Sequence, residues 1–369
     1  MERVKVGIVG IGNISGIYLK NLHGMFKNVI EVVGYADLIQ ERADKAAADW
    51  GGIAFKSDPE LYDRKDIEIV LNLTTPGDHF EVCRDALVSG KSTHVEKPLS
   101  IEREQAAELL KIAQDKGLRV GGAPDTFLGG GIQTCRKLID DGWIGTPVGA
   151  TAFFTCRGHE RWHPDPEFYY KYGAGPMFDM GPYYVTALVN LMGPVKAVTG
   201  SARKTFPTRT ITSEKKYGNI VDVEVDTHIT GTLEFASGAI GTIMTSFDVW
   251  DAQLPRIEIY GTEGSLSVPD PNGFDGPVKW FSSKTGEWSE VPIPYGYRDN
   301  SRGLAVADMA CAIRSGRQHR ANGNLANHVL DVMRGVMDAA HNGKKYELIT
   351  TCERPAPLPL GLRDGFLDL

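Results

Sequence analysis

The fold is decided near the start of the chain by the stretch Val4-Lys5-Val6-Gly7-Ile8-Val9-Gly10-Ile11-Gly12-Asn13-Ile14-Ser15. An apolar run over 4–9 is typical of a buried strand, and it leads directly into a glycine-rich turn before a helical segment. In a dinucleotide-binding unit the first glycine permits the tight turn. The second lets the backbone approach a pyrophosphate, to which the helix N-terminus offers free N–H groups. Ser15 takes the third, packing position, where a small side chain still fits. The stretch predicts that Gly10, Gly12, Asn13 and Ile14 contact a bound dinucleotide.

An acidic residue follows the second predicted strand, 30–36, at the distance that such a site requires. Asp37 lies 22 residues after Ser15, where a carboxylate accepts hydrogen bonds from the adenosine ribose hydroxyls. The carboxylate also repels a 2′-phosphate, and the next three residues, Leu38-Ile39-Gln40, supply no cation that would hold one. We therefore expect NAD to be preferred over NADP as cofactor.

Short β-branched runs alternate with helical patterns up to residue 122, which is typical of βαβ units and a parallel sheet. Ser100 is the expected N-cap of the last of these helices. The pattern predicts an α/β fold whose residues 1–123 form an N-terminal Rossmann domain with a doubly wound parallel sheet. The expected strands are 4–9, 30–36, 53–55, 67–73, 92–95 and 118–121, and the expected helices are 40–50, 80–89 and 101–116.

The pattern changes after residue 123, and a second domain of α+β type is expected over residues 124–369. Two alternating runs flank Ser237-Gly238 and predict an antiparallel hairpin with one buried face. The expected strands are 227–235, 239–247, 256–260 and 265–268, and the expected helices are 131–140, 304–314 and 325–341.

The bulk composition excludes several classes of protein. With 369 residues, 42% hydrophobic and 24% charged, the chain fits two ordinary globular domains. A net charge of -7 with dispersed Lys and Arg argues against nucleic-acid binding. No apolar stretch approaches the roughly 20 residues that span a bilayer, and the strand at residue 4 leaves no room for a secretion signal. Five widely spaced cysteines fit free thiols, so we expect a cytoplasmic protein with no membrane partner.

Two further motifs follow successive strands of the predicted parallel sheet. Thr74-Thr75-Pro76-Gly77-Asp78-His79 comes after the fourth strand, and His94-Val95-Glu96-Lys97-Pro98 comes after the fifth. Together they resemble the Gfo/Idh/MocA family, the relatives of glucose-fructose oxidoreductase and inositol dehydrogenase. In the second domain, residues 138–145 resemble the family's helix-to-strand connection and 173–181 resemble the start of its catalytic helix.

The resemblance implies a C-terminal α+β domain with a large, open, mainly antiparallel sheet that binds substrate and mediates oligomerisation. A homodimer or homotetramer is expected, because an uncovered sheet face would otherwise be a large apolar patch. The resemblance also implies redox chemistry with NAD(P) on sugars or polyols. It places one further group of residues near the cofactor: Thr74, Thr75, Pro76, His79, Glu96 and Lys97. His79 is expected to be structural there, and not an acid or base.

Lys97 is the first candidate for the proton transfer that must accompany hydride transfer from a hydroxyl carbon. In the family this lysine lies beside the nicotinamide, where partial burial is expected to depress its pKa. Asp179 matches the family's aspartate at the start of the helix facing the nicotinamide. An N-terminal helix cap is an equally weighted role for Asp179.

The chain departs from the family four residues after Asp179, where many members carry a proton-abstracting histidine and this sequence has Tyr183. Three interpretations are open. Lys97 is the base and Tyr183 bonds the substrate oxygen, or Tyr183 is a tyrosinate base whose pKa Lys97 lowers, or the usual chemistry is lost. Lys97, Asp179 and Tyr183 are the expected catalytic and substrate-contacting residues.

The segment 157–170 is rich in aromatic and hydrogen-bonding side chains and is interpreted as a substrate loop. Aromatic faces stack on sugar rings, so Trp162 and His163 are expected to line the substrate pocket. A packing role for this loop is an equally weighted alternative. His159, Glu160 and His163 are not expected to bind a metal, because Gly158 and Pro164 prevent the helix that would bring both rings to one face.

The sequence thus predicts an NAD-dependent dehydrogenase acting on the CH–OH group of a sugar, polyol or glycoside. Two alternatives stay open: a lyase or glycosidase that uses NAD for transient internal oxidation, and a non-catalytic NAD-binding regulator. The first differs from a dehydrogenase in that no NADH accumulates.

Overall fold

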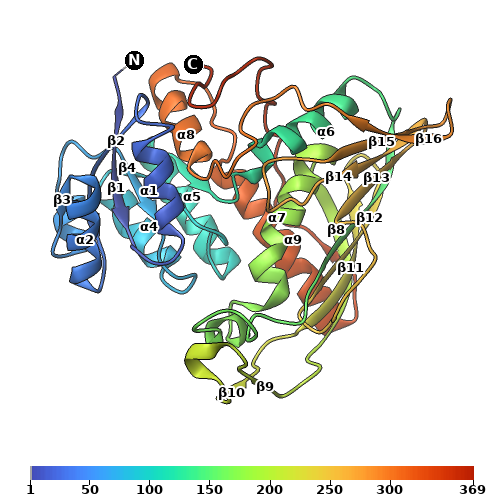
Figure 1. Cartoon of the computed structure of the whole chain (residues 1–369), viewed down its shortest axis with the longest axis horizontal. Helices are drawn as coiled ribbons and strands as arrows, with labels where there is room; N and C mark the ends of the chain where they lie inside the picture. The colour runs from blue at the N-terminus through green and yellow to red at the C-terminus, as the bar shows by residue number, and fades with distance from the viewer. Residues whose placement is uncertain (1) are drawn as a thin grey trace.

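The N-terminal part of the chain forms a six-stranded parallel sheet in the order β3-β2-β1-β4-β5-β6 (Figure 1). It is described here from a computed structural model covering residues 2–369. The central strands β1, β4 and β5 are almost fully buried, because helices cover both faces of the sheet. The order confirms the predicted doubly wound Rossmann sheet. Its strands are β1 (Val4–Val9), β2 (Ile30–Ala36), β3 (Ile53–Ala54), β4 (Ile69–Asn72), β5 (Ser92–Val95) and β6 (Val120–Gly122).

The helices of this sheet lie where the sequence predicts them, with ends shifted by no more than two residues. They are α1 (Ser15–His23), α2 (Gln40–Trp50), α3 (Asp58–Tyr62), α4 (His79–Val88) and α5 (Arg103–Lys116), of which α1 and α3 were not delimited from the sequence. The prediction of Ser100 as a helix cap is wrong. The N-cap of α5 is Glu102, whose backbone N–H donates to Gln105 Oε1. The buried Ser100 hydroxyl donates instead to the Glu102 carbonyl, inside the turn before the helix.

The C-terminal part contains a nine-stranded sheet in the order β16-β15-β14-β13-β7-β12-β11-β8-β17. All its neighbours are antiparallel except β7 and β12, which confirms the expected large, mainly antiparallel sheet. The hairpin around Ser237-Gly238 forms as predicted, with Gly238 at φ 91°. The strands are β7 (Pro147–Thr155), β8 (Val195–Arg203), β11 (His228–Phe235), β12 (Ile240–Ser246), β13 (Ile257–Gly261), β14 (Gly264–Val268), β15 (Val278–Ser282), β16 (Glu287–Val291) and β17 (Tyr346–Glu347); β9 (Thr208–Thr210) and β10 (Ile220–Asp222) pair separately.

Helices α7 (Gly175–Met192) and α9 (Gly323–Asn342) lie between the large sheet and the N-terminal sheet (Figure 1). All but one of the 18 residues of α7 are buried, as expected for a helix with protein on every side. The opposite sheet face has no covering helix in the part of the chain that the structure describes. Its outward side chains on the central strands are largely threonines such as Thr151, Thr230 and Thr242. The centre of this face is therefore not the large apolar patch that we expected.

The chain returns to the N-terminal sheet after the large sheet is complete. Helix α6 (Gly130–Asp140) packs against α7, whereas α8 (Leu304–Ser315) packs against β6. Arg314 of α8 forms an ion pair with Glu68, which precedes β4. The division into domains of residues 1–123 and 124–369 stays a prediction, and α8 belongs spatially to the first of them.

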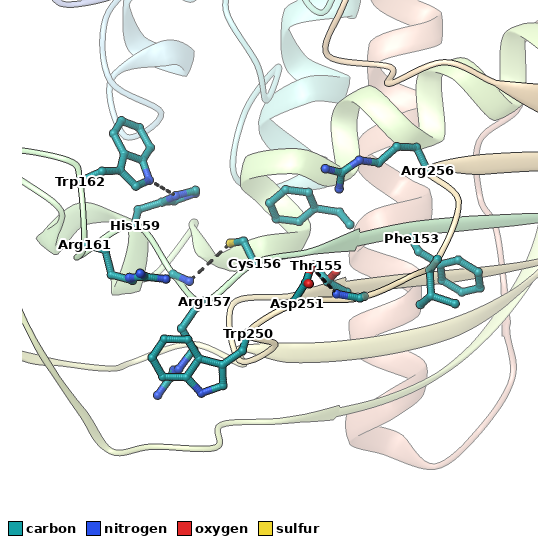
Figure 2. Close-up of a pocket in the computed structure, with 14 residues that line it drawn as sticks. Phe153, Thr155, Cys156, Arg157, His159, Arg161, Trp162, Trp250, Asp251 and Arg256 are labelled. Carbon is teal, nitrogen blue, oxygen red and sulfur yellow. Dashed lines mark hydrogen bonds between the residues drawn. The ribbon is translucent and has the colours of Figure 1, made fainter. Parts of the chain in front are cut away.

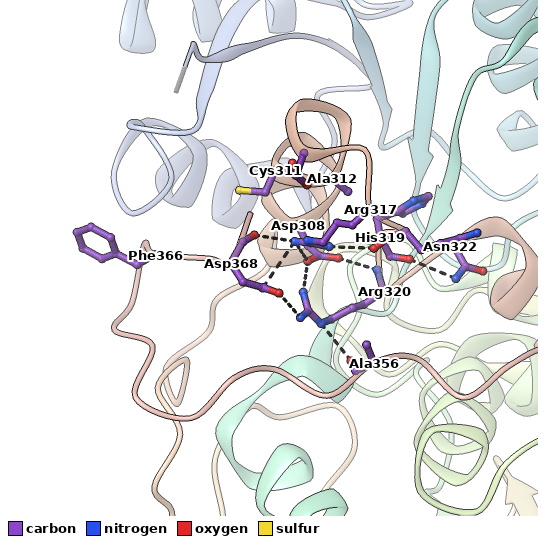
Figure 3. Close-up of polar contacts among 12 residues, drawn as sticks. Asp308, Cys311, Ala312, Arg317, His319, Arg320, Asn322, Ala356, Phe366 and Asp368 are labelled. Carbon is purple, nitrogen blue, oxygen red and sulfur yellow. Dashed lines mark hydrogen bonds and ion pairs between the residues drawn. The ribbon is translucent and has the colours of Figure 1, made fainter.

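A buried ionic cluster fastens the C-terminal tail to α8 (Figure 3). Asp308, whose side chain is fully buried, accepts hydrogen bonds from Arg317 at 2.7 Å and from Arg320 at 2.5 Å. Arg320 also pairs with Asp368 at 2.7 Å, near the end of the chain.

No helix within residues 2–369 is long and apolar enough to cross a membrane, and the five cysteines are free thiols.

Candidate active site

A cleft of about 690 Å³ opens at the carboxyl ends of β1, β2, β4 and β5 and extends to the N-terminal part of α7. Ligands of open α/β sheets bind at this edge. The cleft brings together every residue that we predicted to hold the cofactor. Those lining residues are Gly10, Gly12, Asn13, Ile14, Asp37, Thr74, Thr75, Pro76, His79, Glu96 and Lys97.

The turn between β1 and α1 has the geometry that a pyrophosphate requires. Gly10 has φ 91°, and a Cβ there would lie 2.7 Å from the Leu73 carbonyl carbon, so only glycine fits between β1 and the end of β4. A Cβ on Gly12 would meet nothing within 4 Å, which leaves the backbone open to the cleft. Helix α1 has no side-chain cap at Ile14. Its N-terminal N–H groups and positive dipole end are thus suited to an anionic ligand.

Asp37 directly follows β2 and is held by two hydrogen bonds at the side of the cleft expected to bind adenosine. Its Oδ2 accepts a hydrogen bond from the Ile11 backbone N–H at 2.6 Å, and its Oδ1 accepts one from Ile39 at 2.8 Å. Each oxygen keeps a lone pair for a ribose hydroxyl. Arg42, in the first turn of α2, lies 3.8 Å from Asp37 and lines the same cleft. We did not predict Arg42, which is five residues beyond Asp37 on the helix that opens at this edge.

His79 joins the two motifs that follow β4 and β5. Its Nδ1 lies 2.6 Å from the Pro98 carbonyl and its Nε2 lies 3.1 Å from the Thr74 carbonyl. Burial lowers the pKa of His79 despite both carbonyls, which favour the charged form. Glu96 is also buried and accepts hydrogen bonds from the Tyr18 hydroxyl and the Lys97 backbone N–H.

Lys97 and Asp179 form an ion pair where the two parts of the molecule meet. The Lys97 ammonium donates to Asp179 Oδ1 at 2.9 Å and to the Asp179 carbonyl at 2.7 Å. Burial alone would lower the pKa of Lys97, but the charge of Asp179 outweighs it and the pKa is raised. The expected depression is wrong for this pairing. Burial likewise opposes ionisation of Asp179, yet Lys97 and His159 hold its pKa well below the usual range.

His159 is the residue of the site whose role we missed, having considered it only as a metal ligand. Its Nε2 lies 2.8 Å from Asp179 Oδ2, and its Nδ1 lies 3.2 Å from the Trp162 indole nitrogen. An indole N–H can only donate, so Nδ1 is the acceptor and Nε2 carries the proton that is donated to Asp179. Asp179 is thereby fixed from both sides. No spacing rule links positions 159 and 179, so only the fold brings them together.

Asp179 does not cap a helix. Helix α7 begins at Gly175 with Ala174 as its N-cap, which places Asp179 in the second turn. From there its side chain points to Lys97 and His159 and not to the free N–H groups of the first turn.

Tyr183 lies one turn after Asp179 and lines the same cleft. The Lys97 ammonium is 5.3 Å from the centre of its ring. Burial raises the pKa of Tyr183, and the opposing charges of Lys97 and Arg302 do not compensate for it. The interpretation of Tyr183 as a tyrosinate with a lowered pKa is therefore wrong. A neutral phenol remains, which can donate or accept a hydrogen bond.

His163 and Trp162 lie on different sides of the loop after β7. His163 lines the cleft together with Phe168 and Tyr169, whose rings pack against it and against each other. Trp162 does not line this cleft. Its side chain is 60% exposed and borders a neighbouring cavity, from which it bonds His159. Within residues 2–369 no group of three or more His, Cys, Asp or Glu side chains could hold a metal ion.

Two family models match the chain over most of its length. Residues 4–122 match the oxidoreductase family model for an NAD-binding Rossmann fold, and residues 132–267 match the model of the GFO/IDH/MocA C-terminal domain. The chain belongs to the GFO/IDH/MocA family. The family assigns NAD binding to the N-terminal domain, in agreement with the geometry of the turn after β1.

Characterised relatives of this GFO/IDH/MocA protein include inositol dehydrogenases. It is 25% identical over 272 residues to scyllo-inositol 2-dehydrogenase (NAD(+)) of Bacillus subtilis, which covers 72% of this chain and 74% of that protein. A second B. subtilis protein, scyllo-inositol 2-dehydrogenase (NADP(+)), is 22% identical and covers 82% and 80%. Inositol 2-dehydrogenase/D-chiro-inositol 3-dehydrogenase of Lactiplantibacillus plantarum is 32% identical, but the match spans only 39% of this chain and 42% of that relative.

Solved structures share the whole fold. An NAD binding oxidoreductase from Klebsiella pneumoniae superposes with a TM-score of 0.82 at 20% identity, covering 94% of this chain and 99% of the other. Levoglucosan dehydrogenase in complex with NADH gives a TM-score of 0.81, also at 20% identity, over 95% and 100%. At this identity the likeness establishes the architecture alone.

Proposed function

We propose that this protein is an NAD-dependent dehydrogenase that moves hydride between nicotinamide and a hydroxyl-bearing carbon of a sugar, polyol or glycoside. The observation that carries the proposal is the joining of two features in one cleft. The dinucleotide turn lies at one end, and the Lys97–Asp179–His159 array lies at the other. Family membership and the relatives named as dehydrogenases support it.

Lys97 is the group proposed to exchange a proton with the substrate oxygen. NAD, when bound, supplies the hydride acceptor, and the chain must supply the site for the proton. Because Asp179 raises the pKa of Lys97, the lysine is a proton donor at neutral pH and suits reduction of a carbonyl. In the oxidative direction Lys97 must first lose its proton, so turnover is expected to rise toward alkaline pH.

Asp179 and His159 are proposed to hold Lys97 in place. Asp179 binds the ammonium through Oδ1, and His159 fixes the second oxygen, so the carboxylate has little freedom to rotate. We propose that Tyr183, as a neutral phenol on the other side of Lys97, hydrogen-bonds the substrate oxygen. In this proposal His159 is a positioning residue, because it does not line the cleft itself.

The walls of the cleft support a polyhydroxylated substrate. Phe168 and Tyr169 present aromatic faces, and His163 and Tyr183 add hydrogen-bonding groups beside them. Aromatic rings stack on the C–H faces of sugar rings while polar groups bond their hydroxyls. The inositol and levoglucosan dehydrogenases among the relatives and similar structures act on molecules of this kind, as their names state.

NAD is the proposed cofactor, because Asp37 occupies the position of the ribose hydroxyls. Replacing it in Asp37→Ser removes the repulsion of a 2′-phosphate and frees Arg42, which lies 3.8 Å away. We expect the ratio of kcat/KM for NADP to that for NAD to rise about 10- to 100-fold, which corresponds to roughly 1.4–2.8 kcal/mol. The double variant Asp37→Ser/Arg42→Ala should lose most of this gain. An unchanged ratio in the single variant would show that Asp37 does not set cofactor preference.

The decisive experiment incubates purified protein with NAD and a panel of monosaccharides, inositols and glycosides at mildly alkaline pH. The absorbance of reduced nicotinamide should grow with at least one member. Lys97→Ala should abolish the signal, whereas Lys20→Ala, a matched change at an exposed position on α1, should not. If NAD binds but no NADH accumulates with any member, the dehydrogenase proposal fails. Product analysis would then distinguish an internal-redox lyase or glycosidase from a non-catalytic regulator.

We also propose that copies of the chain pair as a homodimer or homotetramer through the outward face of the nine-stranded sheet. Among the described residues, no helix covers its threonine-rich central strands. Uncovered sheet faces can pack against one another. Light scattering gives the subunit number directly.

The five free thiols fit a reducing compartment, and a cytoplasmic location is proposed on that basis.

A further inference from the structure

A second cavity, whose lining residues are drawn in Figure 2, shares none of them with the cleft. Its volume is about 610 Å³, and it is bordered by the end of β7, the loop after it and the segment 250–256. His159 and Trp162 line it, and His159 in turn contacts Asp179 through Nε2 at 2.8 Å.

The cavity is strongly basic. Arg157, Arg161 and Arg256 line it, against a single carboxylate, Asp251. Arg256 lies 3.7 Å from Asp270, outside the cavity lining. Arg157 and Arg161 form no ion pair within residues 2–369, although most arginines of the chain do. The two carboxylates nearest in sequence, Glu160 and Asp165, already have partners: Glu160 is bound to Arg209, and Asp165 is bound to Lys215 and Lys216.

Arg157 and Arg161 are held over the same aromatic ring. The Arg157 guanidinium is 4.8 Å from the Trp250 ring centre and 5.1 Å from that of Phe206, and the Arg161 guanidinium is 5.3 Å from Trp250. The Nε and Nη1 atoms of Arg157 are shielded from solvent and have no hydrogen-bond partner. Two like charges on one indole, one of them with unsatisfied N–H groups, are costly unless an anion joins them.

We infer that this cavity is a binding site for a compact oxyanion, a carboxylate or phosphate group, held by Arg157 and Arg161. The stacking on Trp250 and Phe206 fixes the planar guanidinium groups, and a planar fork of N–H donors matches the oxygens of such an anion. Because the site is separate from the cleft, it requires neither NAD nor the sugar substrate. Anion binding at this cavity is therefore independent of the proposed dehydrogenase activity.

The test is calorimetric titration of the full chain with inorganic phosphate and, separately, with malonate, at an ionic strength kept constant with NaCl. We expect saturable binding of at least one probe with one site per chain. Arg157→Gln/Arg161→Gln should weaken it about tenfold or more. Arg363→Gln, which removes an exposed arginine elsewhere, should leave it unchanged. If only phosphate binds, the site is selective for phosphoryl groups; if malonate binds as well, it accepts carboxylates.

Arg161 is exposed, so the single variant Arg161→Gln tests the site without endangering the fold and should also weaken binding. Equal binding by wild type and the double variant would overturn the proposal, since phosphate would then occupy another place such as the Gly10–Gly12 turn. Absence of binding by both probes would overturn it too. If, in addition, the double variant changed the subunit number in light scattering, the arginines would belong to an interface between copies of the chain.

Discussion

Asp179 is the carboxylate that keeps Lys97 protonated in the candidate active site. It accepts hydrogen bonds from Lys97 on one oxygen and from His159 on the other. A charged carboxylate beside a buried lysine favours the ammonium form, and this attraction exceeds the opposing effect of burial on the pKa of Lys97. The pKa of Tyr183 is raised as well, but by burial, which opposes ionisation of the phenol even beside two cations. Lys97 is thus held as an ammonium, Asp179 as a carboxylate and Tyr183 as a neutral phenol.

Replacing the carboxylate in Asp179→Asn should lower the pKa of Lys97, because burial then acts without the compensating charge. The neutral lysine that accepts a proton during oxidation would form at lower pH. The rising limb of kcat/KM against pH for oxidation should therefore move about one to three pH units toward acid. We expect a fall in kcat as well, because the ammonium loses its anchor. Steady-state kinetics across the pH range measures both effects.

His159→Gln is the matched control for that shift. The imidazole accepts from the Trp162 indole at Nδ1 and donates to Asp179 through Nε2, and the amide of glutamine can still donate to Asp179. The pH profile of His159→Gln should stay near that of the wild type even where kcat falls. If Asp179→Asn leaves the profile unmoved, Lys97 is not the group that titrates.

At the scale of elements, the two glycines of the turn from β1 to α1 have different roles, one in folding and one in cofactor binding. Gly10 faces the backbone at the end of β4, whereas Gly12 faces the open cleft. Gly10→Ala should therefore destabilise the protein by about 2 kcal/mol or more, through a positive φ and a backbone clash. Gly12→Val should leave the free energy of unfolding almost unchanged yet abolish NADH binding, because its side chain fills the space of the pyrophosphate.

Chemical denaturation and NADH fluorescence titration measure the two quantities on the same samples. Loss of stability in Gly12→Val comparable to that of Gly10→Ala would mean that both glycines serve packing. Normal NADH affinity in Gly12→Val would mean that the pyrophosphate does not approach this turn.

At the scale of the whole molecule, the ionic cluster of Asp308 ties α8 and the segment after it to the C-terminal tail (Figure 3). Asp308 lies on α8, Arg317 and Arg320 follow that helix, and Asp368 lies in the C-terminal tail. Asp308→Asn leaves two arginines, one of them 4% exposed, facing a neutral amide. Breaking one partner of a buried ion pair costs about 3–5 kcal/mol, so a loss of stability near 3 kcal/mol is expected.

Asp115→Asn is the control for that loss. Asp115 pairs with Lys111 on the exposed surface of α5, where an ion pair contributes about 1 kcal/mol or less. Urea unfolding of both variants should show a large effect for Asp308→Asn and a small one for Asp115→Asn. Similar midpoints would indicate that the cluster does not fasten the tail.

The sequence by itself determined the features that depend on neighbours along the chain. The glycine turn after β1, the acid after β2 and the motifs after β4 and β5 are local patterns. Parallel strands bring their carboxyl ends to one edge, so the eleven predicted cofactor residues line one cleft. For the elements that were delimited from the sequence, the boundaries agree within two residues at each end, but β7, α7, β8, β15 and β16 were not delimited. Tyr183 was recognised for the same reason, as a departure within a contiguous motif.

The tertiary structure alone decided what depends on distances between separate segments and on burial. It placed His159 against Asp179, Arg42 beside Asp37, and Trp162 outside the cleft that His163 lines. The direction of the Lys97 pKa is a balance between desolvation and the charge of a residue 82 positions away. Burial and long-range contact have no signature in a single sequence, because they are properties of the packed molecule and not of any one stretch of chain.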